Sequence, residues 1–332
     1  MKKILVLGSS IAGVKAIEEI RRFEPDCEAT ILTDGEYPYD RNLFLPVLAK
    51  EVDYKKIFYK PNDYYEKNRI NVVVGQKIAR INLKKCKVTT DDKQAFEGDV
   101  LIITDAPSYK LPEIKGVNKN GVYTLQQLTE LDQILDFLPL IDAVVIQSDS
   151  PRGAGIASAF LKRDKEVIWV VTNDQIAQDL LNADTTGQMT GARQENKLRV
   201  VAANPIAEIL GEGDVKAIRL KSGKVLAAQI IIFPDAPVDF KVLTDPTVTT
   251  DGKIRVNEQF QTGIEGVFAL DAACLSAPLC GTGSAGQAGV SADPRQESAG
   301  FLLVTVLEEQ GATVAAALKN PKMADAANSK TS

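Results

Sequence analysis

The first 36 residues constrain the fold of this chain more than any other segment. An apolar run over residues 4–7 leads into Gly8, and a helical pattern follows that contains Gly13. A second apolar strand pattern then ends at Asp34. This order of strand, tight turn, helix, strand and acid is typical of a dinucleotide-binding unit, in which the helix N-terminus holds a pyrophosphate and the acid binds a ribose.

The turn departs from the GxGxxG pattern at one position, because Ser10 stands where the middle glycine would be. An ordinary strand–helix–strand unit with a small-residue turn therefore stays open as an alternative. If the segment binds a nucleotide, the contacts are expected from the turn and the first helical residues. These are Gly8, Ser9, Ser10, Ile11, Ala12 and Gly13.

Composition narrows the chemistry that the chain can perform. The net charge of −5 over 332 residues argues against nucleic acid or an anionic membrane surface as the main partner. The chain has no histidine, which excludes Ser-His-Asp triads and most catalytic zinc or non-haem iron sites. Any redox chemistry is therefore expected to come from an organic cofactor.

Cysteine usage predicts a reducing, cytoplasmic location. The four cysteines form neither a CxxC motif nor a zinc-like spacing. Cys274 and Cys280 lie in a Gly/Ala-rich segment, where packing is favoured over a thiol of lowered pKa. We expect no signal peptide and no membrane span, because no apolar run is long enough.

A second strand–helix–strand pattern begins at residue 143 and resembles the first. Strand, hairpin and helix signals surround both units, so the chain is expected to be α/β, with two nested, Rossmann-like, three-layer domains. The predicted first domain comprises residues 1–112 and 238–312. Residues 113–237 form the inserted domain, and residues 313–332 a polar tail.

This order of parts resembles the FAD-dependent pyridine nucleotide-disulfide oxidoreductases, in particular the rubredoxin reductases, ferredoxin reductases and NADH oxidases. The glycine turn resembles their FAD pyrophosphate loop, and residues 38–41 resemble their PYxR element. The resemblance implies FAD as cofactor. Besides the turn, it implies that the FAD contacts are Asp34, Arg41, Ile78, Thr104, Ala106 and Asp271. Glu36 is an alternative to Asp34 as the ribose-binding acid.

The second nucleotide loop departs further from the family pattern. Aligned by sequence, the glycine positions fall on Gln147, Asp149 and, with one inserted residue, Gly153. Asp149 places a negative charge where a pyrophosphate is expected, and Thr172 replaces the ribose-binding acid at the end of the next strand. We therefore do not expect the second loop to bind NAD(P)H in the ordinary way of the family.

The flavin-facing positions also differ from the family. Residues 42–50 contain no cysteine, which argues against disulfide reductase and peroxidase chemistry. Asp105 and Leu270 replace glycines of two family motifs. The family's C-terminal interface domain has no counterpart in this sequence, so the chain is expected to be a divergent member.

Two functions remain open at this stage. The first is an FAD flavoprotein of the NAD(P)H-dependent oxidoreductase type that transfers electrons to or from a protein or a small carrier. The alternative is a non-catalytic relative that acts as a nucleotide-binding or structural subunit of a larger complex. No particular catalytic residue is assigned in either case.

Overall fold

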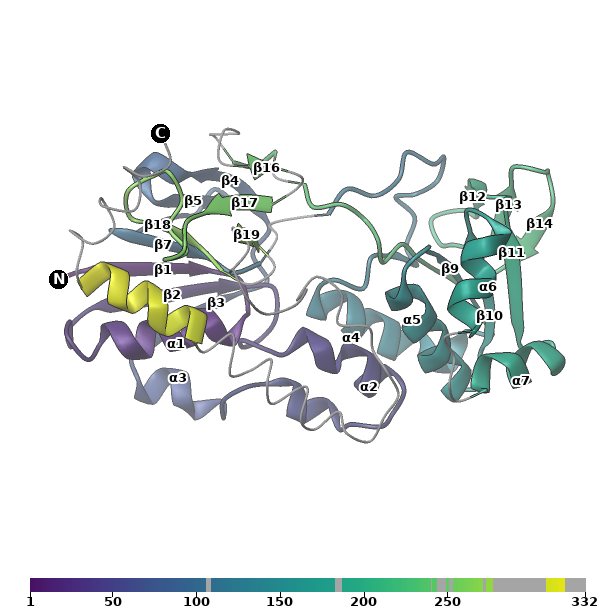
Figure 1. Ribbon diagram of the computed structural model, residues 1–332, viewed down its shortest axis with the longest axis horizontal. Coiled ribbons are helices and arrows are strands. Elements are labelled where there is room, and N and C mark those ends of the chain that lie inside the picture. Colours follow the sequence, from purple (N-terminus) through teal and green to yellow (C-terminus); the bar gives the residue numbers. More distant parts are fainter. Residues whose placement is uncertain are drawn as a thin grey trace.

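The chain folds into two α/β domains that lie side by side (Figure 1). The computed structural model describes residues 1–105, 109–182, 187–239, 241–243, 249–250, 253–270, 273–276 and 309–319. Within these ranges the expected fold class is confirmed, because each domain is built on a five-stranded parallel sheet.

The sheet of the first domain has the strand order β18-β7-β1-β2-β3. Its strands are β1 (Lys3–Leu7), β2 (Glu28–Thr33), β3 (Ile70–Val74), β7 (Val100–Ile103) and β18 (Val267–Ala269). The central strands are almost wholly apolar because both faces of the sheet are covered.

Alternate residues of β1 point into two separate cores. Ile4 and Val6 pack with helix α1 (Ile11–Ile20). Leu5 and Leu7 pack on the opposite face, toward two small sheets. One of these is the antiparallel sheet β4 (Ile78–Asn82), β5 (Lys87–Thr90) and β6 (Ala95–Glu97). The other contains β16 (Thr249–Thr250), β17 (Lys253–Val256) and β19 (Cys274–Ser276).

The inserted domain repeats this plan with the strand order β11-β10-β9-β15-β8. Its parallel strands are β8 (Val122–Tyr123), β9 (Ala143–Gln147), β10 (Glu166–Val171), β11 (Leu198–Ala202) and β15 (Ile230–Ile232). Its helices are α4 (Leu128–Phe137), α5 (Pro151–Lys162), α6 (Asp174–Asn182) and α7 (Gln188–Gln194). Its antiparallel strands are β12 (Ile206–Leu210), β13 (Ala217–Leu220) and β14 (Val225–Ala227).

Part of the first domain packs into the core of the second. Helix α2 (Phe44–Leu48) contributes Phe44, Val47 and Leu48 to the cluster that holds Trp169 and Phe160 of the inserted domain. The remaining short helices are α3 (Asp63–Lys67) and the 3-10 turns Arg41–Leu43, Tyr54–Ile57, Leu83–Lys85 and Leu138–Leu140.

The start of the segment expected to be a polar tail, residues 313–319, belongs to a helix. Residues 309–319 are helical and lie beside α1 (Figure 1, yellow). Val314 and Ala315 are buried in the α1 core, and a Cβ built on Gly311 would lie 2.3 Å from the carbonyl oxygen of Ala12. Small and apolar side chains at helical spacing therefore dock this segment, a pattern that the high Ala content obscured in the sequence.

Gly8 provides a test of the turn that ends β1. Its φ is +122°, and a Cβ there would lie 2.3 Å from Thr104 Oγ1 and 2.7 Å from the Asp105 nitrogen. Gly75 also has a positive φ, of +67°, but a Cβ there would meet nothing within 4 Å. Both Gly→Ala changes incur a backbone cost of about 1–2 kcal/mol.

We expect Gly8→Ala to lower the free energy of unfolding by about 1–3 kcal/mol more than Gly75→Ala, because of this added crowding. Urea denaturation of the two variants measures the difference. Equal losses of stability would show that the turn tolerates a side chain at residue 8.

Candidate functional site

The first nucleotide loop, residues 8–10, has the backbone shape expected from the sequence. The Gly8 N–H donates to the carbonyl of Leu32 at 2.8 Å, and the Ser10 hydroxyl caps α1 by accepting from the Ala12 N–H at 3.3 Å. A Cβ on Gly13 would lie 2.6 Å from Val6 Cγ1, so glycine there permits close packing of helix on strand. The loop thus presents a helix N-terminus at the carboxyl edge of the sheet.

A carboxylate of the chain itself lies on this loop. Asp105 follows the end of β7, and its Oδ2 accepts from the Ser9 N–H and from the Ser9 hydroxyl, each at 2.7 Å. Its Oδ1 forms an ion pair with the guanidinium of Arg41, which also donates to the Tyr109 hydroxyl at 3.3 Å. The loop N–H, the hydroxyl and the cation therefore converge on one anionic group.

Sequence reasoning missed this role because it treated Asp105 only as a lost glycine. Since β7 pairs in parallel with β1, with Ile103 opposite Leu7, the residues that follow the two strands are neighbours. An acid two positions beyond β7 therefore faces a donor two positions beyond β1. That register was the available signal.

Asp34, the expected ribose ligand, is engaged by the chain as well. Its carboxylate accepts from the Tyr39 hydroxyl at 2.8 and 3.0 Å and from the Leu128 N–H at 2.9 Å. Leu128 is the first residue of α4, so Asp34 links the first domain to a helix N-terminus of the second. Burial and the neighbouring Asp105 charge raise the pKa of this carboxyl above its usual value.

The other expected contacts surround the loop in different ways. Thr104 is buried beneath it and donates to the carbonyl of Leu7 at 3.3 Å, whereas Ile78 begins β4 and packs against the core on the other face of the sheet. Leu270, which replaces a family glycine, is fully buried among the α1 core residues. Ala106 and Asp271 lie outside the described residues.

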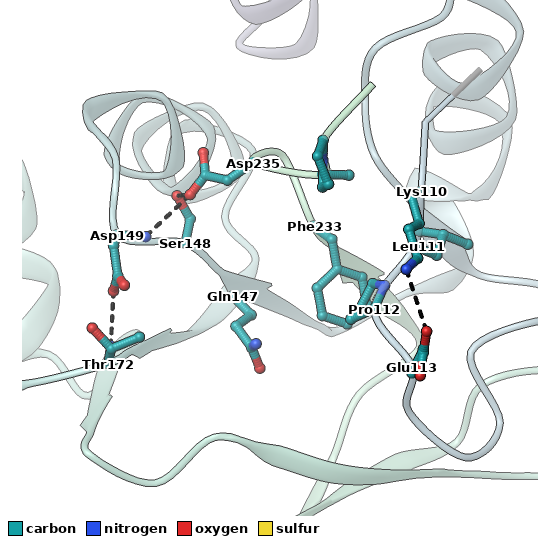
Figure 2. Close-up of a pocket in the computed structure, with 12 residues that line it drawn as sticks. Lys110, Leu111, Pro112, Glu113, Gln147, Ser148, Asp149, Thr172, Phe233 and Asp235 are labelled. Atoms are coloured by element: carbon teal, nitrogen blue, oxygen red, sulfur yellow. Dashed lines mark hydrogen bonds and ion pairs between the residues drawn. The ribbon is translucent and has the colours of Figure 1, made fainter. Parts of the chain in front are cut away.

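The inserted domain has a cavity of about 510 Å³ at the carboxyl edge of its sheet (Figure 2). Asp149, Thr172 and Asp235 lie along one part of it, and apolar residues such as Leu111 and Phe233 line the rest. Asp235 accepts from the Ser148 hydroxyl at 2.6 Å, while Asp149 accepts from the Thr172 N–H at 2.8 Å. Lys110 at the rim pairs with Glu113 at 3.3 Å.

The structure corrects the alignment of this second loop. Three residues separate β9 from α5, as three residues separate β1 from α1, so no residue is inserted. The glycine positions are therefore Ser148, Ser150 and Gly153, and not Gln147 and Asp149 as the sequence alignment had them. A Cβ on Gly153 would lie 2.4 Å from Ser148 Cβ, which explains why this glycine remains.

Arg152, the second residue of α5, does not line the cavity. Its guanidinium donates to the Leu125 carbonyl at 2.6 Å, and burial lowers its pKa. Within the described ranges, no group of three or more His, Cys, Asp or Glu side chains has the geometry of a metal site. Nor does any helix there combine the length and apolar character needed to cross a bilayer.

The raised pKa of Asp34 gives a pH-dependent contribution to stability. Because its carboxyl ionises less readily when folded than at its ordinary value of 3.8, the folded state binds more protons above that pH. Stability from this group is therefore present at low pH and is lost as pH rises through the folded pKa.

We expect the stability difference between the wild type and Asp34→Asn to be most favourable to the wild type near pH 3.8 and to decline above it. Urea midpoints measured across the pH range give this difference. A difference that grows with pH would mean that the Tyr39 and Leu128 donors outweigh burial.

Comparison with known proteins agrees with this architecture. The chain is 22% identical over 279 residues to the NAD(P)H coenzyme A polysulfide/persulfide reductase of Pyrococcus horikoshii, covering 81% of this chain and 62% of that protein. It is 24% identical to rhodocoxin reductase of Rhodococcus erythropolis over 84% of this chain and 66% of that one. The chain thus spans less than two thirds of the length of these curated relatives.

Solved structures give the same fold at low sequence identity. Putidaredoxin reductase, in its covalent complex with putidaredoxin, superposes with a TM-score of 0.70 at 16% identity, covering 96% of this chain and 75% of that one. NADH:rubredoxin oxidoreductase from Clostridium acetobutylicum gives a TM-score of 0.66 at 18% identity, covering 95% and 74%.

The family model described as pyridine nucleotide-disulphide oxidoreductase matches residues 2–295. This range includes both parallel sheets, both nucleotide loops and Arg41. On that match, the chain belongs to the pyridine nucleotide-disulphide oxidoreductase family.

Proposed function

We propose that the protein is an FAD-binding electron-transfer flavoprotein whose cofactor lies across the carboxyl edge of the first sheet. The observation that carries the proposal is the convergence of the Ser9 N–H, the Ser9 hydroxyl and the Arg41 guanidinium on one anionic position. Asp105 now fills that position, and a phosphate of FAD would take its place. FAD would supply the redox chemistry, since the chain has no histidine and residues 42–50 contain no cysteine.

The backbone around the loop supports a fit to FAD. The turn at Gly8 and the close packing at Gly13 keep the helix N-terminus directed at the site. Ile78 and Asp271 are proposed contacts to the remainder of the cofactor, together with Ala106. Asp34 now accepts from two donors, the Tyr39 hydroxyl and the Leu128 N–H, and a carboxylate has about four lone-pair sites. We therefore propose that it also accepts a ribose hydroxyl.

A protein or a small carrier is proposed as the redox partner. Relatives of the chain include reductases of small redox proteins, one of them solved in complex with its redoxin. Cys27 and Cys86 are buried free thiols, which agrees with the proposed reducing, cytoplasmic setting.

One observation favours a second function, that of a non-catalytic subunit. Asp105 accepts from the Ser9 N–H and hydroxyl, so these two loop donors have a partner within the chain. A chain that never binds FAD would keep this arrangement permanently. The absorbance spectrum separates the two functions.

We expect the purified protein, or the protein incubated with FAD and desalted, to show flavin bands near about 370 and 450 nm. Equilibrium dialysis against FAD measures the same binding without relying on retained colour. A protein that stays colourless and binds no FAD would overturn the flavoprotein proposal and leave the subunit function.

Asp105 is expected to weaken FAD binding by competing for Ser9 and Arg41 and by repelling phosphate. Asp105→Gly and Asp105→Asn should therefore tighten FAD binding by about tenfold or more, since a like charge at a binding site costs more than about 1.4 kcal/mol. The Asn variant keeps the shape of the side chain and removes its charge. Isothermal titration with FAD measures the change.

Asp99→Asn is the matched control, because Asp99 caps the opposite end of the same strand pair by accepting from the Lys3 N–H at 2.7 Å. It should leave the FAD affinity unchanged. Arg41→Ala should weaken binding, since Arg41 is the cation at the site. Unchanged affinity in both Asp105 variants would remove Asp105 from the cofactor site.

A further inference from the structure

In each domain an acid at the corresponding position accepts hydrogen bonds from the nucleotide loop. In the first domain Asp105 follows β7 and accepts from the N–H of Ser9, the second loop residue. In the inserted domain Asp235 follows β15 and accepts from the N–H of Asp149, again the second loop residue, at 3.1 Å. Since β15 pairs with β9 as β7 pairs with β1, the same register produces both contacts.

Asp235 accepts more hydrogen bonds from its loop than Asp105 accepts from the first loop. Besides the Asp149 N–H, it accepts from the hydroxyl of Ser148 at 2.6 Å and from that of Ser150 at 2.5 Å. These donors belong to the loop residues on which a dinucleotide pyrophosphate would rest. All three now donate to one carboxylate of the chain. Figure 2 shows Ser148 and Asp149 beside Asp235.

Charge separates the second loop from the first. The Asp105 carboxylate forms an ion pair with Arg41. Arg41 could form an ion pair with an incoming phosphate instead. In the part of the chain that the structure describes, neither Asp149 nor Asp235 forms an ion pair with a lysine or arginine. A pyrophosphate at the second loop would therefore meet two carboxylates. Arg152, whose charge interacts with that of Asp235, donates to the Leu125 carbonyl and does not line the cavity.

We infer that the inserted domain does not hold NAD(P)H, because Asp235 occupies the loop donors that would bind its pyrophosphate and Asp149 adds a second negative charge. The cavity beside them admits uncharged or cationic groups. Its apolar part, formed by Leu111, Pro112 and Phe233, suits the uncharged portion of such a ligand. The inference concerns the inserted domain alone and does not depend on whether the first domain binds FAD.

The chain carries a built-in probe of this loop. Trp169 is its one tryptophan, is fully buried, and donates its indole N–H to the Ser148 carbonyl at 3.0 Å. Excitation of Trp169 and detection of energy transfer to a bound nicotinamide therefore report directly on binding. Equilibrium dialysis of the full chain with NADH and with NADPH gives an independent value.

We expect the wild type to bind neither NADH nor NADPH at concentrations up to about 1 mM, which corresponds to a binding free energy weaker than about −4.1 kcal/mol. The double variant Asp149→Asn/Asp235→Asn should bind at least one of them at least about tenfold more tightly. High salt should increase the affinity of the wild type for NADH and NADPH, because salt screens the electrostatic repulsion.

Asp142→Asn is the matched control, since Asp142 precedes β9 at the opposite edge of the same sheet. It removes one charge from the domain and should leave nucleotide binding as weak as in the wild type. Circular dichroism confirms that each variant is folded, and the single variants replace the double variant if it is not. Micromolar binding by the wild type would overturn the inference, as would folded Asp149 and Asp235 variants that bind no better than Asp142→Asn.

Discussion

The parallel pairing of β1 with β7, and of β9 with β15, is the constraint on which the sites of this protein depend. It brings the residues after β7 beside the loop after β1, and the residues after β15 beside the loop after β9. Each loop offers N–H groups at the start of a helix, and these groups need an acceptor whether or not a ligand is present. Asp105 and Asp235 supply that acceptor from within the chain.

The fold could be predicted from the sequence because its signals are local. Apolar strands such as residues 4–7 and 143–146, and glycines required by close contacts, indicate the two nested units without knowledge of tertiary contacts. The contact of Asp105 with Ser9 joins residues 96 positions apart, so no local pattern reveals it. The second loop was misaligned by one residue because Ser148 and Ser150 stand at glycine positions, so the sequence there does not match the glycine pattern.

Replacement of glycine by acid changes what a nucleotide loop requires. A glycine at the position of Asp105 or Asp235 would leave the loop donors to a ligand, whereas an acid accepts from them and adds charge. In the first domain Arg41 offsets that charge, but the second domain has two acids at its loop. The two domains therefore share one architecture while the charges at their loops differ.

Asp34 gives the nucleotide edge of the first domain a mechanical link to the second. Its carboxylate holds the first N–H of α4, and α4 packs against α2 and contributes to the core around Trp169. The carboxylate at the edge of the first sheet is thus also the acceptor that holds the start of a helix in the shared core, so the loss of this one side chain would be felt in both domains.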